Sequence, residues 1–234
     1  PSLYFYNNGA TFQLIDNITS NGLSFYLTSG ITFDSNGKNL KFTNSTNSDF
    51  TFTGASKTFN NVWFSRGTST GIITIAGSNT FADFKDDGSA AHTVKFTSLT
   101  TQTVTTFTVN GTAGNVISLN STTTGVKWGV STSTSDISCD YLSIKDSTAT
   151  PNTYTWYAGA NSTNVSNNTG WIFTEPTTTT TSTTSSTTTS TTTSSTTSTT
   201  TSNSSTSSTT TTNLTTTTTT SSTTTTNSST STST

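Results

Sequence analysis

The side chains that could carry nucleophilic or acid–base chemistry are few in this sequence. Its 234 residues include one histidine, His92, and one cysteine, Cys139. Serine and aspartate abound, so residue types alone leave a Ser–His–Asp triad open, but we recognise no G-x-S-x-G nucleophile elbow. His92 precedes the strand-like segment 93–96 and is interpreted as a surface residue. Cys139 lies in an alternating stretch and is interpreted as a small, half-buried hydrophobe.

Paired carboxylates are the other possible chemistry, because glycoside hydrolases hold two of them roughly 5–9 Å apart across a groove. Asp86 and Asp87 are adjacent and precede a glycine, a pattern typical of a turn between strands. Asp140 and Asp146 could lie near Asp83 if successive coils stack on one another. We interpret these aspartates as surface residues and expect no catalytic residue and no enzyme. A polysaccharide-active β-helix enzyme is the least favoured alternative.

No cofactor is expected from the motifs. The sequence has no Cys/His cluster for zinc and no phosphate-binding glycine loop. It also lacks the calcium loops of EF-hands and of GGxGxD repeats, although clustered Asp and Asn oxygens leave calcium as an open alternative. The formal net charge of −2 at pH 7 argues against nucleic acid as a partner.

Aromatic residues form the last group of candidate binding residues. Exposed rings on one face could stack on sugars, and we single out Trp156, Tyr157 and Trp171 for this role. The competing interpretation is that Trp63 and Trp128 cover the hydrophobic core, while Trp156 and Trp171 cap the C-terminal end of the folded region. The two interpretations differ in whether the rings are exposed.

The composition changes abruptly after Pro176. Residues 177–234 are Ser and Thr apart from Asn203, Asn213, Leu214 and Asn227. Ordering one residue costs about 1–2 kcal/mol of backbone entropy, whereas burying the single leucine returns only about 2 kcal/mol. We therefore expect two regions, a folded head (1–176) and an extended low-complexity tail (177–234). The tail is typical of O-glycosylated, mucin-like stalks, with candidate acceptors beginning at Thr177, Thr178 and Thr179.

Short strand-like segments recur in the head at a fixed spacing. Two families of segments repeat every 21–23 residues: Thr58–Val62, Thr80–Phe84 and Thr103–Phe107, and Ile73–Ile75, Val94–Phe96 and Ile117–Leu119. A looser echo occurs at Thr11–Ile15. A period near 22 with two strands per repeat predicts an all-β parallel β-helix, or solenoid, in which equivalent apolar residues stack inside the coil. An antiparallel β-sandwich is the alternative, since it also has closely and regularly spaced strands.

Several of these segments are similar to the repeats of a known class of protein. TFNNVWF (58–64), GSNTFADF (77–84), residues 100–128, DYLSIKDSTA (140–149) and NNTGWIF (167–173) resemble the repeat-type parallel β-helix proteins of bacterial surfaces, which are adhesin-like, secreted and mostly of unassigned function. The resemblance covers about residues 56–174 and rests on structural rungs, so it implies fold and location but little chemistry. The sequence starts at Pro1 and contains no Met, which we interpret as a mature product whose signal segment has been removed.

The sequence also contains candidate sites for N-linked glycosylation, which bear on where the protein is found. Asn-x-Ser/Thr sequons occur in the head at Asn17, Asn44, Asn110, Asn120, Asn161, Asn164 and Asn167. Ser and Thr are so frequent that chance alone accounts for most of these sequons. The last three remain the best candidates, because the loop before Trp171 is expected to be exposed. No apolar run is long enough to cross a membrane. We expect an extracellular or cell-surface glycoprotein with covalent glycans.

The N-terminal strand suggests how such a protein would assemble. Leu3, Tyr4, Phe5 and Tyr6 form an aromatic segment that either caps the solenoid or pairs with another subunit. Head-to-tail stacking without closure gives a filament. We therefore expect a non-catalytic structural protein that forms a surface layer or filament with copies of itself. A stalk-mounted adhesin or carbohydrate-binding module is the main alternative.

Overall fold

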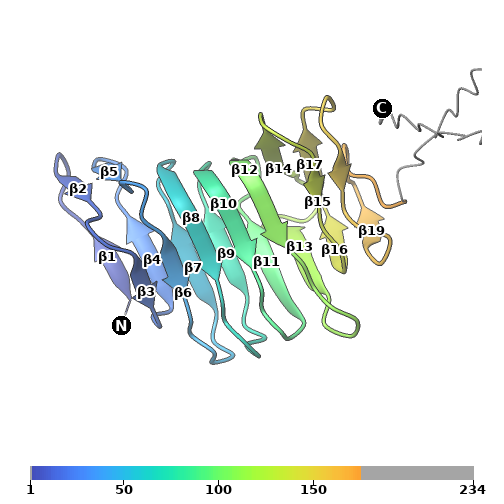
Figure 1. The fold of residues 1–234 in the computed structure, drawn as a ribbon, viewed down its shortest axis with the longest axis horizontal. Helices are drawn as coiled ribbons and strands as arrows, with labels where there is room; N and C mark the ends of the chain where they lie inside the picture. Colours follow the sequence, from blue (N-terminus) through green and yellow to red (C-terminus); the bar gives the residue numbers. More distant parts are fainter. Residues whose placement is uncertain (1, 175–234) are drawn as a thin grey trace, which may run out of the picture. The chain divides into compact units, whose positions relative to one another are not determined.

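The computed structural model describes residues 2–174, which form a β-solenoid of about seven coils (Figure 1). The predicted parallel β-helix is confirmed, and the antiparallel sandwich is wrong, because all pairs of named strands are parallel. This part of the chain contains no helix, and hence none that could cross a membrane. The predicted tail, its boundary at Pro176 and the acceptors Thr177, Thr178 and Thr179 lie outside the described residues.

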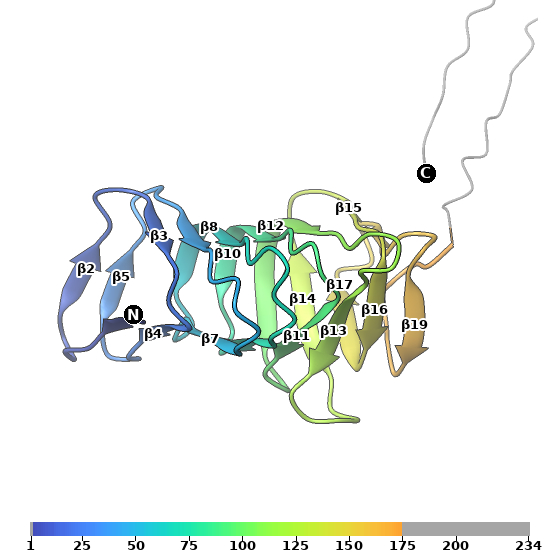
Figure 2. The same cartoon turned by 90° about the horizontal axis from the view of Figure 1, so that it is seen from below.

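Two long sheets form the walls of the solenoid (Figure 2). The first sheet consists, in spatial order, of β1 (Leu3–Phe5), β4 (Ser24–Leu27), β7 (Phe50–Thr53), β9 (Ile73–Ala76), β11 (His92–Phe96), β13 (Ile117–Ser121), β16 (Leu142–Lys145) and β19 (Thr163–Ser166). The second consists of β3 (Ile18–Ser20), β6 (Leu40–Phe42), β8 (Thr58–Phe64), β10 (Thr80–Asp86), β12 (Thr101–Val109), β14 (Trp128–Thr132) and β17 (Ser147–Thr150).

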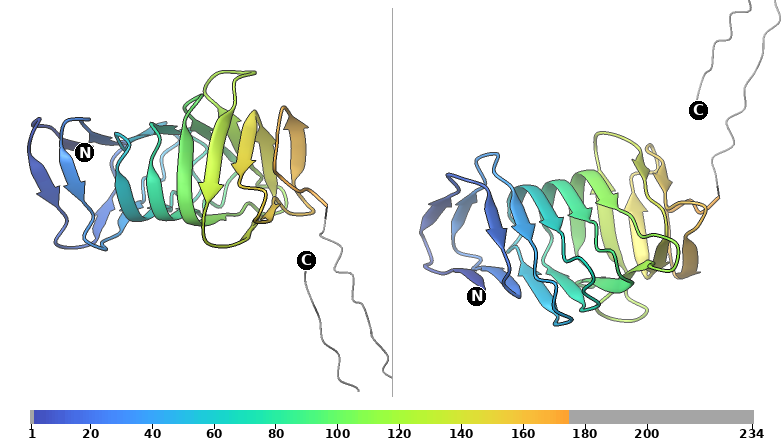
Figure 3. Two further views of the ribbon diagram at one scale, coloured as in Figure 1. Left: turned by 90° about the horizontal axis from the view of Figure 1, so that it is seen from above. Right: turned by 60° about the horizontal axis from the view of Figure 1, so that its bottom comes forward.

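Two short sheets complete the coils at either end of the described region. They pair β2 (Thr11–Gln13) with β5 (Thr32–Asp34), and β15 (Ile137–Ser138) with β18 (Trp156–Tyr157). In the central coils, β8, β10 and β12 each form one long strand, as both views in Figure 3 show. The coil shape therefore changes along the solenoid while the stacking of the first sheet continues.

The sequence repeats correspond to rungs of the solenoid. Thr80 pairs with Thr58 on one side and with Thr103 on the other, as the first repeat family predicts. In the second family Val94 pairs with Ile73 as predicted, but its other partner is Leu119 rather than Ile117. The coil between β11 and β13 is two residues longer than the repeat suggested. An even shift keeps the same side chains on the inner face, so the prediction of the core was unaffected.

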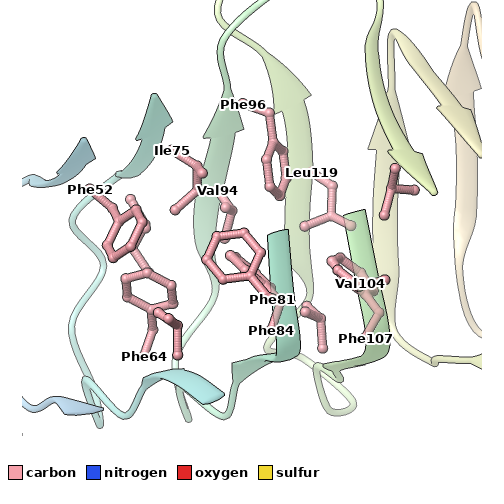
Figure 4. Packing of buried hydrophobic residues seen from close by; sticks show 14 of the residues in the cluster. Phe52, Phe64, Ile75, Phe81, Phe84, Val94, Phe96, Val104, Phe107 and Leu119 are labelled. Carbon is pink, nitrogen blue, oxygen red and sulfur yellow. The ribbon is translucent and has the colours of Figure 1, made fainter. Parts of the chain in front are cut away.

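Phenylalanine ladders fill the interior (Figure 4). Stacked parallel strands lie about 4.8 Å apart, which brings rings at equivalent positions within stacking distance. The centroids of Phe25 and Phe52 are 4.7 Å apart with an interplanar angle of 11°, and those of Phe84 and Phe107 are 5.4 Å apart at 13°. Burying each such side chain contributes about 2–3 kcal/mol. These ladders hold the coils together without disulfides.

Candidate functional site

A buried histidine–aspartate pair lies where β10 turns into β11. Asp86 is the last residue of β10, and His92 is the first residue of β11. His92 Nε2 lies 2.8 Å from Asp86 Oδ2, and their side chains are only 3% and 1% exposed. The interpretations of His92 as a surface residue and of Asp86 as an exposed turn residue were therefore wrong. Both side chains follow the inward alternation of their strands, in which His92, Val94 and Phe96 are buried.

Both nitrogens of the His92 ring face acceptors. Nδ1 lies 2.8 Å from the carbonyl oxygen of Ala90, and Nε2 faces the Asp86 carboxylate. Burial lowers the pKa of His92, but the hydrogen bond to Asp86, the charge of that carboxylate and the Ala90 carbonyl together outweigh burial. The pKa of His92 is therefore raised, and the doubly protonated ring satisfies both contacts.

This raised pKa gives a pH dependence of stability. A group with a folded-state pKa above its unfolded value of about 6.5 contributes its full stabilisation below that value. The contribution is lost as the pH rises through the folded-state pKa. We expect the difference in unfolding free energy between wild type and His92→Gln to shrink as the pH rises from 6 towards 9.

Urea unfolding of both proteins at a series of pH values measures this difference. His92 is the only histidine, so one imidazole NMR signal reports its titration directly. A midpoint at or below the ordinary histidine value would contradict the predicted direction.

Arg66 closes the neighbouring corner and was not singled out from the sequence. It is the only arginine in the chain, and it is 3% exposed. Its guanidinium donates four hydrogen bonds to backbone carbonyl oxygens, those of Asn44, Thr46, Ser48 and Gly71, at 2.5–3.2 Å. Burial lowers the pKa of Arg66, while the charges of Asp86 and Asp49 raise it. We call Arg66, Asp86 and His92 the corner cluster.

A G-x-S-x-G pentapeptide, Gly67–Gly71, lies in the same corner and was also missed in the sequence. Its Ser69 is buried, and the hydroxyl donates to the carbonyl oxygen of Thr46 at 2.5 Å. The pentapeptide joins two strands, β8 and β9, and so differs from the strand–turn–helix of a nucleophile elbow. The Ser69 hydroxyl is hydrogen-bonded to backbone, and the two His92 ring nitrogens face Ala90 and Asp86 rather than Ser69. The arrangement of these groups holds loop backbone in place.

The remaining aspartates are separated. Asp83 has Asn61 and Thr106 as its neighbours in the sheet, so the predicted proximity to Asp140 and Asp146 was wrong. Asp140 accepts hydrogen bonds from the backbone and side chain of Asn161, at 3.0 and 2.8 Å. Within residues 2–174, no three His, Cys, Asp or Glu side chains are grouped as metal ligands. Asp83, Asp140 and Asp146 thus act as acceptors that link successive coils.

Cys139 is buried against the core, as a hydrophobic residue would be. Desolvation raises the pKa of its thiol to about 12. A thiol that stays protonated is a poor nucleophile. The interpretation as a packed hydrophobe is confirmed, with deeper burial than expected.

The tryptophans do not provide the predicted sugar-stacking surface. Trp156 is fully buried and Trp171 is 9% exposed, their rings packing edge to face with centroids 5.5 Å apart. Tyr157 is half-buried in β18. The competing interpretation, that Trp156 and Trp171 close the core at its C-terminal end, is confirmed, as is the burial of Trp128.

Trp63, in contrast, points outward, where it was expected to cover the core. It lies on the outer face of the second sheet between its register neighbours Lys41 and Lys85. The two ammonium nitrogens lie 3.5 and 4.3 Å from the ring centroid. These cation–π contacts cover the indole with lysine side chains.

The sequons differ in how their amide nitrogens are used. Asn44, Asn161 and Asn167 donate from Nδ2 to groups on neighbouring coils, at 2.6–2.8 Å. Asn17, Asn110 and Asn164 have exposed side chains, and Asn120 is half-buried on β13. The expected exposure of the segment before Trp171 is confirmed. Glycosylation at all seven positions stays a prediction.

Exposed hydrophobic side chains gather at the two ends of the described solenoid. Of the large hydrophobic residues that are exposed in residues 2–174, only Leu99 belongs to a central coil. The others lie in the first coil, in the turn after it, or in the last coil: Tyr4, Tyr6, Ile15, Leu23, Val165 and Ile172. A surface hollow beside Leu99 has a volume of 160 Å³, below the roughly 300–1,000 Å³ of ligand pockets.

Comparison with known proteins gives no further guide, since no family model, curated protein or solved structure matches this chain. A β-solenoid hosts many functions, so the fold by itself identifies none. The function has to be inferred from the distribution of side chains and strand edges on this molecule.

Proposed function

We propose that this protein is a structural subunit of an extracellular or cell-surface filament, built by stacking of its solenoids end to end. The observation that carries the proposal is that both end coils leave apolar side chains exposed or only partly buried: Leu3, Phe5 and Phe12 at one end, and Val165, Ile172 and Phe173 at the other. Contiguous exposed apolar groups mark interaction sites on soluble proteins. Here they occur at both ends of one axis, as repeated head-to-tail contacts require.

The strand edges support the same contact. β1 and β19 are the outer strands of the eight-stranded sheet, and each has one neighbour in the structure, β4 or β16. All pairs in this sheet are parallel, so the β19 edge of one copy can continue the same ladder onto the β1 edge of the next. Natural edge strands are commonly protected by lysine, proline or bulges. β1, with the sequence LYF, has none of these features.

The side chains of the first coil are suited to burial. Leu3 and Phe5 point towards the core and are half-buried, as are Phe12 and Ile18 on the other faces of the coil. A stacked copy would bury the remainder of this apolar rung. At the opposite end, Val165 and Ile172 are exposed and Phe173 is partly buried. Both ends therefore offer apolar area to the proposed contact.

Lysines at the inward positions of β1 should prevent stacking. We expect the full chain to form elongated species whose size grows with concentration in sedimentation velocity. The double variant Leu3→Lys/Phe5→Lys should associate at least about tenfold more weakly, because stacking would bury two charges without partners.

The control variant is Thr51→Lys/Thr105→Lys, which adds the same charge at exposed positions of β7 and β12, outside the two end coils. It should associate like the wild type. A wild type that stays monomeric at all concentrations, or equal association of the two variants, would overturn the proposed function.

A further inference from the structure

Two exposed tyrosines and a half-buried third form an aromatic patch on the outer face of the first sheet. Tyr4 is 50% and Tyr6 is 58% exposed, and their ring centroids lie 5.7 Å apart with planes inclined by only 9°. Tyr26 is the register partner of Tyr4 on β4, and its centroid lies 6.2 Å from Tyr4 and 5.7 Å from Tyr6. We call Tyr4, Tyr6 and Tyr26 the tyrosine patch. It faces away from the core and sideways to the solenoid axis.

Hydroxyl groups lie beside the rings, and the strands that carry them are uncharged. The Tyr4 hydroxyl lies 3.3 Å from Ser24 Oγ, which in turn lies 2.9 Å from Ser2 Oγ. The three strands at this end of the sheet, β1, β4 and β7, carry no charged residue. The patch thus combines near-parallel aromatic rings with neutral hydrogen-bond donors and acceptors.

From this chemistry we infer that the tyrosine patch binds a neutral pyranose oligosaccharide. Sugars with equatorial hydroxyls present flat faces of C–H groups, whose partial positive charge matches the negative face of an aromatic ring. Their hydroxyls bond to neutral side-chain oxygens of the kind found at Ser2, Ser24 and Tyr4. Two half-exposed rings and a more buried third offer much less area than the roughly 800 Å² that each partner buries in a stable protein–protein contact. A small, flat ligand is therefore favoured over a second copy of the chain.

This inference differs from the sugar-stacking prediction made from the sequence, since Trp156 and Trp171 are buried. It is also independent of the proposed function. Filament contacts would use the edge of β1 and its inward residues Leu3 and Phe5, whereas the patch uses the outward residues of the same segment. Substitutions at alternate positions therefore separate the two proposals.

The test is isothermal titration calorimetry of the full chain with cellohexaose, a neutral β-linked oligosaccharide, and with hexagalacturonate, its charged counterpart. We expect saturable binding of cellohexaose and none of hexagalacturonate. Tyr4→Leu/Tyr6→Leu keeps apolar side chains but removes the flat rings, and should weaken binding at least about tenfold. Tyr4→Phe/Tyr6→Phe keeps the rings and should stay within about threefold of wild type if stacking dominates.

Tyr157→Leu, on the distant strand β18, is the control for loss of an outward tyrosine and should bind like the wild type. Circular dichroism and the unfolding midpoint show whether each variant is folded. Absence of saturable cellohexaose binding by the wild type would overturn the inference, as would unchanged binding by the double leucine variant. If that variant instead loses self-association while the wild type binds no sugar, the patch is a contact between copies and the inference is wrong.

Discussion

Replacing Arg66 with alanine is expected to lower the free energy of unfolding by about 3–5 kcal/mol. The guanidinium donates hydrogen bonds to four backbone carbonyl oxygens, three in the loop between β6 and β7 and one in the loop between β8 and β9. Alanine leaves these acceptors without donors and opens a cavity between two coils. Charge-assisted hydrogen bonds contribute more than neutral ones, which places this substitution among the most damaging in the head.

Two further variants separate geometry from charge. Arg66→Lys keeps the charge but loses the planar fork that reaches several carbonyls at once, so it should still destabilise by about 1–3 kcal/mol. Lys57→Ala removes the same charge from a half-buried surface side chain that makes one hydrogen bond, to the carbonyl oxygen of Ser29. It should change stability by less than about 0.5–1 kcal/mol. Urea unfolding gives all three values, and an Arg66→Ala loss no larger than that of Lys57→Ala would contradict this role.

Asp86→Ala is the second large expected loss, also about 3–5 kcal/mol. The substitution leaves the His92 ring buried beside Arg66 without its counter-charge. It also removes the acceptor of the Gly88 backbone N–H, which lies 3.0 Å from Asp86 Oδ1. The raised pKa of His92 should fall at the same time, because the hydrogen bond and charge that raise it come from Asp86.

Asp87→Ala provides the matched control, since Asp87 is the adjacent aspartate and its side chain is exposed. It should shift stability by less than about 0.5 kcal/mol. Equal losses from the two substitutions, or an unchanged titration of His92 in Asp86→Ala, would show that the ion pair does not stabilise the corner.

The fold could be predicted because the spacing of the sequence repeat gives the register in which the strands pair. Thr58, Thr80 and Thr103 align in the sequence and pair in the sheet, since stacking neighbours one coil apart makes sequence spacing equal to spatial adjacency. The error at Ile117 arose from a longer loop, which changes the spacing without changing the inward face. The positions of the strands and the side chains that face the core could therefore be predicted from the sequence, whereas the length of each coil could not.

The corner cluster was harder to predict, although its residues left a signal. Extending the alternation of Val94 and Phe96 back by one step places His92 inside. The same step forward from Phe84 places Asp86 inside, and from Phe64 it places Arg66 inside, but the polar character of these residues favoured a surface interpretation. Trp63 was misplaced for a different reason. Phe59 and Val62 both face inward across the two half-buried asparagines between them, so strict alternation fails at this point of β8.

Whether an aromatic residue is exposed depends on its position in the end coils of the solenoid. Trp156 and Trp171 lie where the core must be closed, and their large rings complete it. Tyr4 and Tyr6 occupy outward positions of β1, so alternation alone would have distinguished them from Leu3 and Phe5. Treating these four residues as one assembly segment hid two different surfaces.

The most direct test of end-to-end stacking is hydrogen–deuterium exchange of the β1 backbone amides as a function of protein concentration. β1 has a hydrogen-bonded neighbour on one side only in the described structure. If its free edge pairs with another copy, amides in Leu3–Phe5 should become more protected as concentration rises, while those of the central strand β9 stay constant. Protection of β1 that is the same at all concentrations would contradict the account.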